Sequence, residues 1–228
     1  MTARPSPARR LSSLWFFAGG LAVVLVIGVI AIAASRDDGS DDDGDAAGAE
    51  VAAAVEIDGR PLPAFQSGGD DPATGERPPV VIGEDFEGRQ VTIGERGTPQ
   101  LLVFLAHWCP HCQAEVPRIV AFGNAGGIPS GLDVVAIATN TKRERDNYPP
   151  SAWLAREGWS WPVLLDTANG EVATAYGLGS FPFFVAVDSE GRVVARASGE
   201  LGDDAIADLV GRALDGVDPS STPSTAGP

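Results

Sequence analysis

QLLVFLAHWCPHC, residues 100–112, joins an uninterrupted apolar run to the only two cysteines of the chain. The run Gln100–Ala106 is short and apolar, which is typical of a strand buried on both faces of a sheet. Residues Gln113–Phe122 carry apolar side chains at helical spacing. The cysteines are therefore predicted to lie between a buried strand and the first turn of a helix.

This position suits redox chemistry. The partial positive charge and unpaired amides of a helix N-terminus favour a thiolate over a thiol. Cys109, expected to be the more exposed, is the predicted attacking nucleophile, and Cys112, one turn later, the predicted resolving thiol. Pro110 suits the first helical position, where a missing N–H costs nothing. His111 lies between the cysteines in the chain, and a cationic imidazole there would make the disulfide more oxidising.

Two other interpretations of the cysteine pair stay open. A metal site built from both cysteines and one of the two histidines, His107 or His111, would lack a fourth ligand. An inert structural disulfide would be unusual, because so small a loop constrains the unfolded chain very little. A redox-active dithiol is the preferred interpretation, and neither a metal nor another cofactor is expected.

The composition excludes several classes of protein. The chain has 228 residues, is 44% hydrophobic and carries a formal charge of −15. It can bury a core, but it lacks the basic surface that a nucleic-acid-binding protein needs, so no nucleic-acid partner is expected. Two cysteines exclude both a disulfide-rich scaffold and a four-cysteine zinc site.

The N-terminal part changes composition twice. Residues 1–13 are basic and are expected to stay in the cytoplasm. Residues 14–34 are uncharged and apolar, and as a helix they would span about 31 Å, which matches the hydrocarbon core of a bilayer. Residues 35–54 are acidic and are expected to form a disordered linker. This order predicts a signal anchor, with a single pass through the cell membrane and the rest of the chain outside the cytoplasm.

Two alternatives to the anchor remain. The sequence Ala31-Ile32-Ala33 resembles a signal-peptide cleavage site, although the apolar core would be long for a cleaved signal. A buried soluble helix is less favoured, because residues 14–34 have no polar face.

Residues 55–215 are predicted to form one α/β domain, a central mixed sheet flanked by helices, and residues 216–228 a disordered tail. The expected strands are Pro79–Ile82, Val91–Ile93, Gln100–Ala106, Leu132–Ala138 and Trp161–Leu165, with a hairpin of Phe183–Val187 and Arg192–Ala197. The expected helices are Gln113–Phe122, an interrupted surface helix within Lys142–Gly158, Glu171–Tyr176, and Asp203–Leu214 with Leu214 on its apolar face.

Two motifs in this order resemble the thioredoxin superfamily, in particular its TlpA- or ResA-like branch of membrane-anchored, extracytoplasmic thiol–disulfide oxidoreductases. The first is Trp108–Cys112 after a buried strand, followed by Glu115 on the helix. The second is Gly177–Pro182, which runs into the strand Phe183–Val187. The resemblance covers about residues 60–215 and implies a thioredoxin-like fold.

The resemblance also implies roles for single residues. Pro182 is expected to be a cis-proline packed against the disulfide, and the backbone of Phe181 to pair with an extended partner segment. Phe181 departs from the small or β-branched residue of the family. Glu115 corresponds to an acidic residue of the branch that accepts a proton or tunes the dithiol; the alternative is a solvated helix carboxylate. Val103 replaces a buried aspartate of ordinary thioredoxin, which favours a role for Glu115.

Other residues near the motif are given structural roles. Trp108 is expected to shield the sulfurs at the substrate-binding edge, and His107 to be an exposed loop residue. Trp153, Trp159 and Trp161 are expected in the core or at its rim.

The predicted function is disulfide exchange with protein substrates. The resemblance implies apocytochrome c during cytochrome c maturation or secreted proteins as substrates, a membrane redox partner, and a part in cell redox homeostasis. The direction stays open, because the branch mostly reduces whereas Pro110-His111 resembles strongly oxidising periplasmic enzymes. One alternative is a copper metallochaperone, which would need another histidine or thioether donor. A peroxidase-like relative would need an isolated peroxidatic cysteine.

Overall fold

The computed structural model describes residues 49–216. The predicted cytoplasmic segment 1–13, the predicted anchor 14–34 and the tail after Gly216 lie outside these residues. Within 49–216, no helix has both the length and the apolar character needed to cross a membrane. The end of the predicted linker, from residue 49 on, lies against the domain, because the Ala52 N–H donates to the carbonyl of Asp166 over 3.1 Å.

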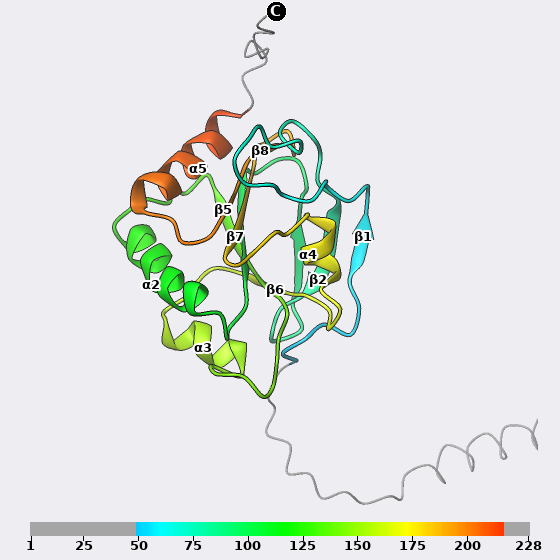
Figure 1. Cartoon of the computed structure of the whole chain (residues 1–228), viewed down its shortest axis with the longest axis vertical. Helices are drawn as coiled ribbons and strands as arrows, with labels where there is room; N and C mark the ends of the chain where they lie inside the picture. The colour runs from blue at the N-terminus through cyan, green and yellow to red at the C-terminus, as the bar shows by residue number, and fades with distance from the viewer. Residues whose placement is uncertain (1–48, 217–228) are drawn as a thin grey trace, which may run out of the picture. The chain divides into compact units, whose positions relative to one another are not determined.

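The central sheet is mixed, as predicted. Its strand order is β6-β5-β4-β7-β8, with β4 parallel to β5, β5 parallel to β6, and β7 antiparallel to both β4 and β8 (Figure 1). Its five strands are β4 (Gln100–Leu105), β5 (Asp133–Ala138), β6 (Val163–Leu165), β7 (Phe183–Val187) and β8 (Val193–Ser198). The expected strands of this sheet are confirmed with small shifts at their ends.

β4 occupies the middle of the sheet because both of its faces are apolar. Leu101, Val103 and Leu105 point into one hydrophobic cluster, and Leu102 and Phe104 into the other. All five side chains are buried. Full burial of each side chain of this size contributes about 1.5–3 kcal/mol. Burial of these side chains on both faces therefore stabilises β4 in the middle of the sheet.

The two faces of the sheet are covered differently. In Figure 1, α2 and α5 lie on one side of the sheet, and α4 lies on the other with a second, antiparallel sheet of order β1-β2-β3. These elements are α2 (Pro110–Asn124), α4 (Glu171–Ala175), α5 (Asp203–Asp215), β1 (Glu56–Asp58), β2 (Val80–Glu84) and β3 (Gln90–Ile93). β2 and β3 were expected, whereas the short β1 and the separate sheet were not.

The helix expected within Lys142–Gly158 is shorter than predicted. Only α3 (Pro150–Arg156) is helical, and residues 142–147 form turns. A proline is tolerated in the first turn of a helix, but it disfavours a helical backbone in the residue before it. The helix therefore starts at Pro150. Trp153 and Leu154 are buried, whereas Ala152, Ala155 and Arg156 are exposed, so α3 lies at the surface with one face packed on the core.

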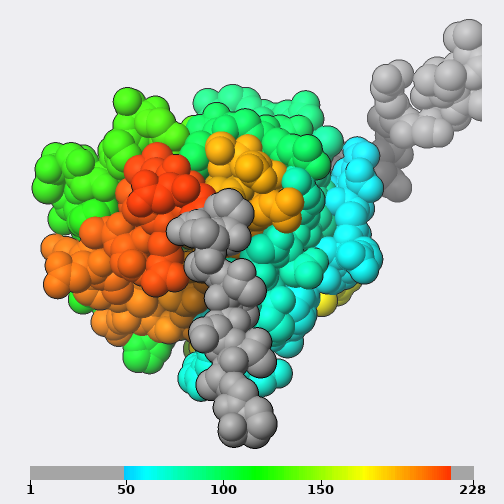
Figure 2. Space-filling model, turned by 90° about the horizontal axis from the view of Figure 1, so that it is seen from above, coloured from blue at the N-terminus to red at the C-terminus, as the bar shows by residue number. Residues whose placement is uncertain are grey.

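The predicted position of Leu214 is wrong. α5 buries Ile206, Leu209, Val210 and Ala213, whereas Leu214 is 42% exposed. At about 100° per residue, Ala213 falls in line with Ile206 and Leu214 falls well to one side. Figure 2, seen from the end opposite α3, shows α5 (orange to red) on the outer surface beside the β7–β8 turn.

The three tryptophans expected in the core or at its rim lie there. Trp153 and Trp159 are buried, and Trp161 is half-buried and packs edge-on against Trp159 with ring centroids 5.1 Å apart. They extend the hydrophobic cluster that contains both cysteines.

A buried ion pair ties the segment before β2 to the central sheet. The guanidinium of Arg196 on β8 donates to both carboxylate oxygens of Asp71, at 2.8 Å and 2.5 Å, and to the carbonyls of Pro63 and Tyr176. Burial would raise the pKa of Asp71, but hydrogen bonds from Arg196 and Ala73 outweigh it and hold that pKa below its ordinary value.

Replacing Asp71 with Asn leaves the buried guanidinium of Arg196 without its counter-ion. Removing one partner of a buried ion pair costs about 3–5 kcal/mol, so urea unfolding at pH 7 is expected to show a loss near this range. Because the pKa of Asp71 is lowered in the folded protein, its contribution is present above the unfolded value of about 3.9 and is lost as pH falls through the folded value. The difference from the wild type should therefore shrink in acid.

The matched control is Asp208→Asn, which removes an exposed pair with Arg212 on α5. Its expected loss is below about 1 kcal/mol. Equal losses in the two variants would contradict the importance assigned to Asp71.

Candidate active site around Cys109 and Cys112

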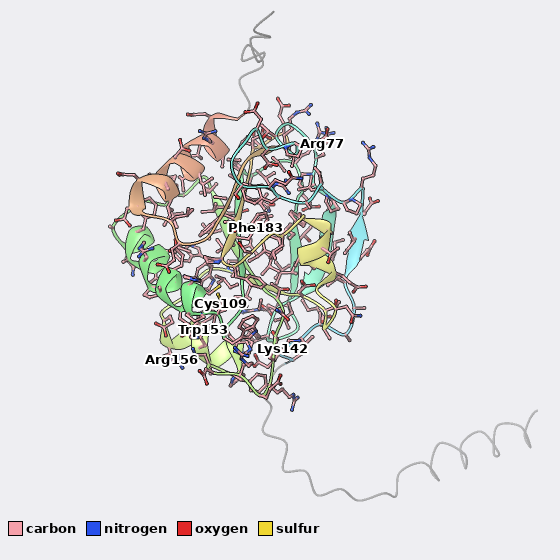
Figure 3. The ribbon with its side chains drawn as sticks, in the orientation of Figure 1. Arg77, Cys109, Lys142, Trp153, Arg156 and Phe183 are labelled. Carbon is pink, nitrogen blue, oxygen red and sulfur yellow. The ribbon has the colours of Figure 1, made fainter. Side chains whose placement is uncertain are left out.

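The cysteine pair lies at the junction of β4 and α2, as predicted. A turn after β4, closed by the Cys109 N–H donating to the carbonyl of Ala106 over 2.9 Å, brings the chain to the helix. Cys109 is the N-cap of α2, and Pro110 starts the helix. No side chain caps this N-terminus, so the amides of the first turn keep their positive potential next to the cysteines. Figure 3 shows Cys109 at this end of α2.

The two thiols, both free, differ in exposure. Cys109 is 7% exposed and Cys112 is completely buried, so the expected order of exposure is correct. Burial strongly raises the pKa of the Cys112 thiol, and the neighbouring Cys109 and Glu115 add to this effect. Only Cys109 is placed to meet a partner sulfur, while Cys112 is held in its protonated form.

Glu115 is buried, so the alternative of a solvated helix carboxylate is wrong. It lies on α2 one turn after Cys112. Its carboxylate accepts a 2.6 Å hydrogen bond from the guanidinium of Arg118 and one of 3.1 Å from the N–H of Leu201. Burial raises the pKa of Glu115 above its ordinary value, and Leu201 and Arg118 only partly oppose this. A carboxyl group with a raised pKa next to a buried thiol can hold or accept a proton there.

Trp108 and Phe181 form an aromatic edge beside the cysteines. Their rings meet edge-on with centroids 6.3 Å apart, and both pack against the cluster that contains the two sulfurs. The indole N–H of Trp108 donates to the carbonyl of Asn140 over 2.8 Å, and Arg145 stacks over its ring at 5.0 Å. The bond between Phe181 and Pro182 is cis, as expected for Pro182.

The prediction of an exposed His107 is wrong. The side chain is buried, its Nδ1 lies 2.7 Å from the carbonyl of Asp146, and its Nε2 accepts the N–H of Lys142 over 3.1 Å. Nε2 is therefore the acceptor and Nδ1 carries the proton. Burial lowers the pKa of His107 and favours this neutral ring. His107 thereby fixes the turns of residues 142–146 beside the motif, where Figure 3 shows Lys142 at the same end of the domain as Cys109.

His111 is exposed and paired. Its Nδ1 lies 2.7 Å from the carboxylate of Glu200, in the loop between β8 and α5, and its side chain is 67% exposed. Neither this contact nor the contacts that Arg118 and Leu201 make with Glu115 were predicted. Glu200 and Leu201 come from the far end of the chain, whereas Arg118 lies three residues after Glu115 on α2; none of the three belongs to a recognised motif. Among residues 49–216, no group of three or more potential metal ligands is present, and nothing there favours the copper-binding alternative.

Comparison with known proteins identifies the family. The Redoxin family matches residues 58–210, more than half of the chain. The methylamine utilization protein MauD of Methylophilus methylotrophus is 27% identical over 128 residues, which cover 55% of this chain and 56% of the relative. The thiol-disulfide oxidoreductase ResA of Geobacillus thermodenitrificans is 28% identical over 130 residues, covering 57% of this chain and 71% of the relative.

A solved structure agrees in fold. The thiol:disulfide interchange protein of Chlorobium tepidum, a thioredoxin family protein, superposes with a TM-score of 0.50 and 23% identity, covering 68% of this chain and 98% of that one. The match to MauD spans little more than half of that relative's length. These matches confirm the resemblance seen in the sequence and the thioredoxin-like α/β fold. The chain belongs to the Redoxin family, a member of the thioredoxin superfamily, and is similar to the thiol-disulfide oxidoreductase ResA.

Proposed function

We propose that this protein exchanges disulfides with protein substrates outside the cytoplasm, through Cys109 and Cys112. One observation carries the proposal: of two thiols at the N-terminus of α2, Cys109 keeps 7% of its residue surface exposed, whereas Cys112 is completely buried on the same helix as the buried carboxylate of Glu115. The first can meet a partner and the second can act only after the first has reacted, which is the order that disulfide exchange needs.

The exchange proceeds in two steps. The Cys109 thiolate attacks one sulfur of a substrate disulfide; that S–S bond breaks, a substrate thiolate leaves, and a mixed disulfide forms. Cys112 then gives up its proton and attacks the sulfur of Cys109, which releases the second substrate thiol and leaves an enzyme disulfide. Two electrons pass from the enzyme to the substrate. The same steps in reverse transfer a disulfide to a substrate.

Glu115 is proposed to take the proton of Cys112 in the second step. The two residues are three positions apart on α2, so their side chains lie on the same face of the helix. The raised pKa of the carboxyl brings its proton affinity closer to that of the buried thiol. Proton transfer between groups of similar affinity is easier than transfer to an ordinary carboxylate.

The location outside the cytoplasm is proposed from the sequence of the N-terminal part. A basic segment, an apolar segment long enough to cross a bilayer and an acidic segment follow one another before residue 55. The natural substrates proposed on the resemblance are apocytochrome c or secreted proteins, with a membrane redox partner that restores the cysteine pair. Protease protection of intact cells, with and without permeabilisation, tests the location.

Replacing each cysteine tests their roles. Cys109→Ala is expected to abolish exchange, because the buried Cys112 cannot reach a substrate. Cys112→Ala keeps the attacking sulfur but cannot resolve, so mixed disulfides are expected to accumulate and to appear as heavier bands on non-reducing gels. The assignment is wrong if Cys109→Ala stays active while Cys112→Ala traps no partner.

Replacing Glu115 with Gln tests the proton transfer. We expect resolution of a mixed disulfide at pH 7, followed by stopped-flow fluorescence, to slow by about a hundredfold. Because the pKa of Glu115 is raised, the carboxylate base forms only above the ordinary value of about 4.3, and the rate of the wild type should rise with pH there. The variant should lack that rise. The control is Asp208→Asn on α5; a similar slowing in this control would contradict the role.

The reduction potential gives the direction of exchange. A cationic His111 next to the dithiol stabilises the reduced form, so we expect a potential above the thioredoxin value of about −270 mV. A value near about −120 mV would indicate a donor of disulfides. His111→Ala should lower the potential, measured by equilibration with glutathione and alkylation. An unchanged potential in His111→Ala would remove this residue from the redox machinery.

A further inference from the structure

Glu200 contacts two residues of the active-site helix with one carboxylate. It lies in the loop between β8 and α5. One oxygen lies 2.7 Å from Nδ1 of His111, and the other lies 3.8 Å from Nη2 of Arg118. His111 is in the first turn of α2 and Arg118 is two turns further along the same helix. The carboxylate therefore bridges the redox motif and the middle of α2.

The loop that carries Glu200 is fixed on α2 by independent bonds. Arg118 donates to the carbonyl of Leu201 over 2.8 Å and to Glu115 over 2.6 Å. The N–H of Leu201 donates back to Glu115 over 3.1 Å. Backbone and side chain of the loop are thus both bonded to the helix. The position of the Glu200 carboxylate relative to the cysteines follows from these contacts.

This ion pair has little to contribute to folding. The side chain of His111 is 67% exposed and that of Glu200 is 37% exposed. Exposed ion pairs add little stability, because water competes for both partners. Glu200 is therefore expected to affect the reaction of the cysteines more than the free energy of unfolding.

The charges around His111 give the direction of that effect. The charged groups at the ring are Glu200 from the loop, which contacts it directly, and Arg118, which contacts the same carboxylate; both cysteines lie within two residues of His111 in the chain. The Glu200 carboxylate lies 2.7 Å from Nδ1 and so places its negative charge directly against the ring. Arg118 balances part of the carboxylate's charge.

We propose that Glu200 is a positioning residue that acts through His111 and shifts the redox equilibrium of the Cys109–Cys112 pair toward the dithiol. The inference rests on the proposed function. In the reaction considered, two glutathione thiols reduce the enzyme disulfide; the products are glutathione disulfide, the Cys112 thiol, the Cys109 thiolate and one released proton. A cationic His111 held beside that thiolate favours these products.

The test is a double-mutant cycle on the full-length protein. Glu200→Gln is made in the wild type and in His111→Ala, and each protein is equilibrated with glutathione buffers and analysed by alkylation and gel shift. In the wild type, Glu200→Gln should lower the equilibrium constant for reduction about threefold to fivefold, the upper range for an exposed ion pair. Fivefold corresponds to about 20 mV for a two-electron couple. In His111→Ala, the same change should have less than about a twofold effect.

Two further variants sharpen the result. Glu190→Gln removes an exposed carboxylate paired with Arg192 at the β7–β8 turn, and it should leave the equilibrium unchanged. Glu200→Asp keeps the charge and should keep most of the effect. Equal shifts of Glu200→Gln in both backgrounds, or no shift in the wild type, would overturn the inference. A wild type that never equilibrates with glutathione would overturn the proposed function as well.

Discussion

The burial of β4 on both of its faces is the constraint from which the active site follows. A strand whose residues from Leu101 to Leu105 are all apolar is best placed in the middle of the sheet, between two hydrophobic clusters. Its last residue, Leu105, therefore ends at a fixed place, and the turn that follows brings Cys109 to the start of α2. The two cysteines owe their different exposure to this placement, since the next turn of the helix enters the core.

The active-site helix is held from both directions. Upstream, His107 uses both ring nitrogens to fix the turns of residues 142–146 beside the motif. Downstream, Arg118 and Glu115 bond the loop between β8 and α5. Each of these hydrogen bonds joins a polar or charged side chain close to the cysteines in sequence to a segment outside the motif. The chemistry at the cysteines is thus set by segments that are remote in the chain.

Much of this architecture follows from local pattern. β4 could be predicted from its unbroken apolar run, the site from the two cysteines that follow it, and the bend at Pro182 from its motif. The contacts of His107 and Glu200 could not, because each joins segments far apart in the sequence and neither has a periodic signal. The prediction for Leu214 was wrong for a different reason. The spacing of apolar residues defines the buried face of a helix only to within the angular width of that face, and Leu214 lies at its edge.

The aromatic edge has a consequence for how proteins of this kind diverge. Phe181 comes from the loop before β7 and Arg145 from the turns before α3, whereas both cysteines lie at the start of α2. Apart from Trp108, which directly precedes Cys109, the residues of this edge and the sulfur pair are therefore encoded on separate stretches of chain. Substitutions in the two outer loops can change the surface beside Cys109 while the sulfur pair and the helix that carries it stay as they are, so this surface and the dithiol can vary independently.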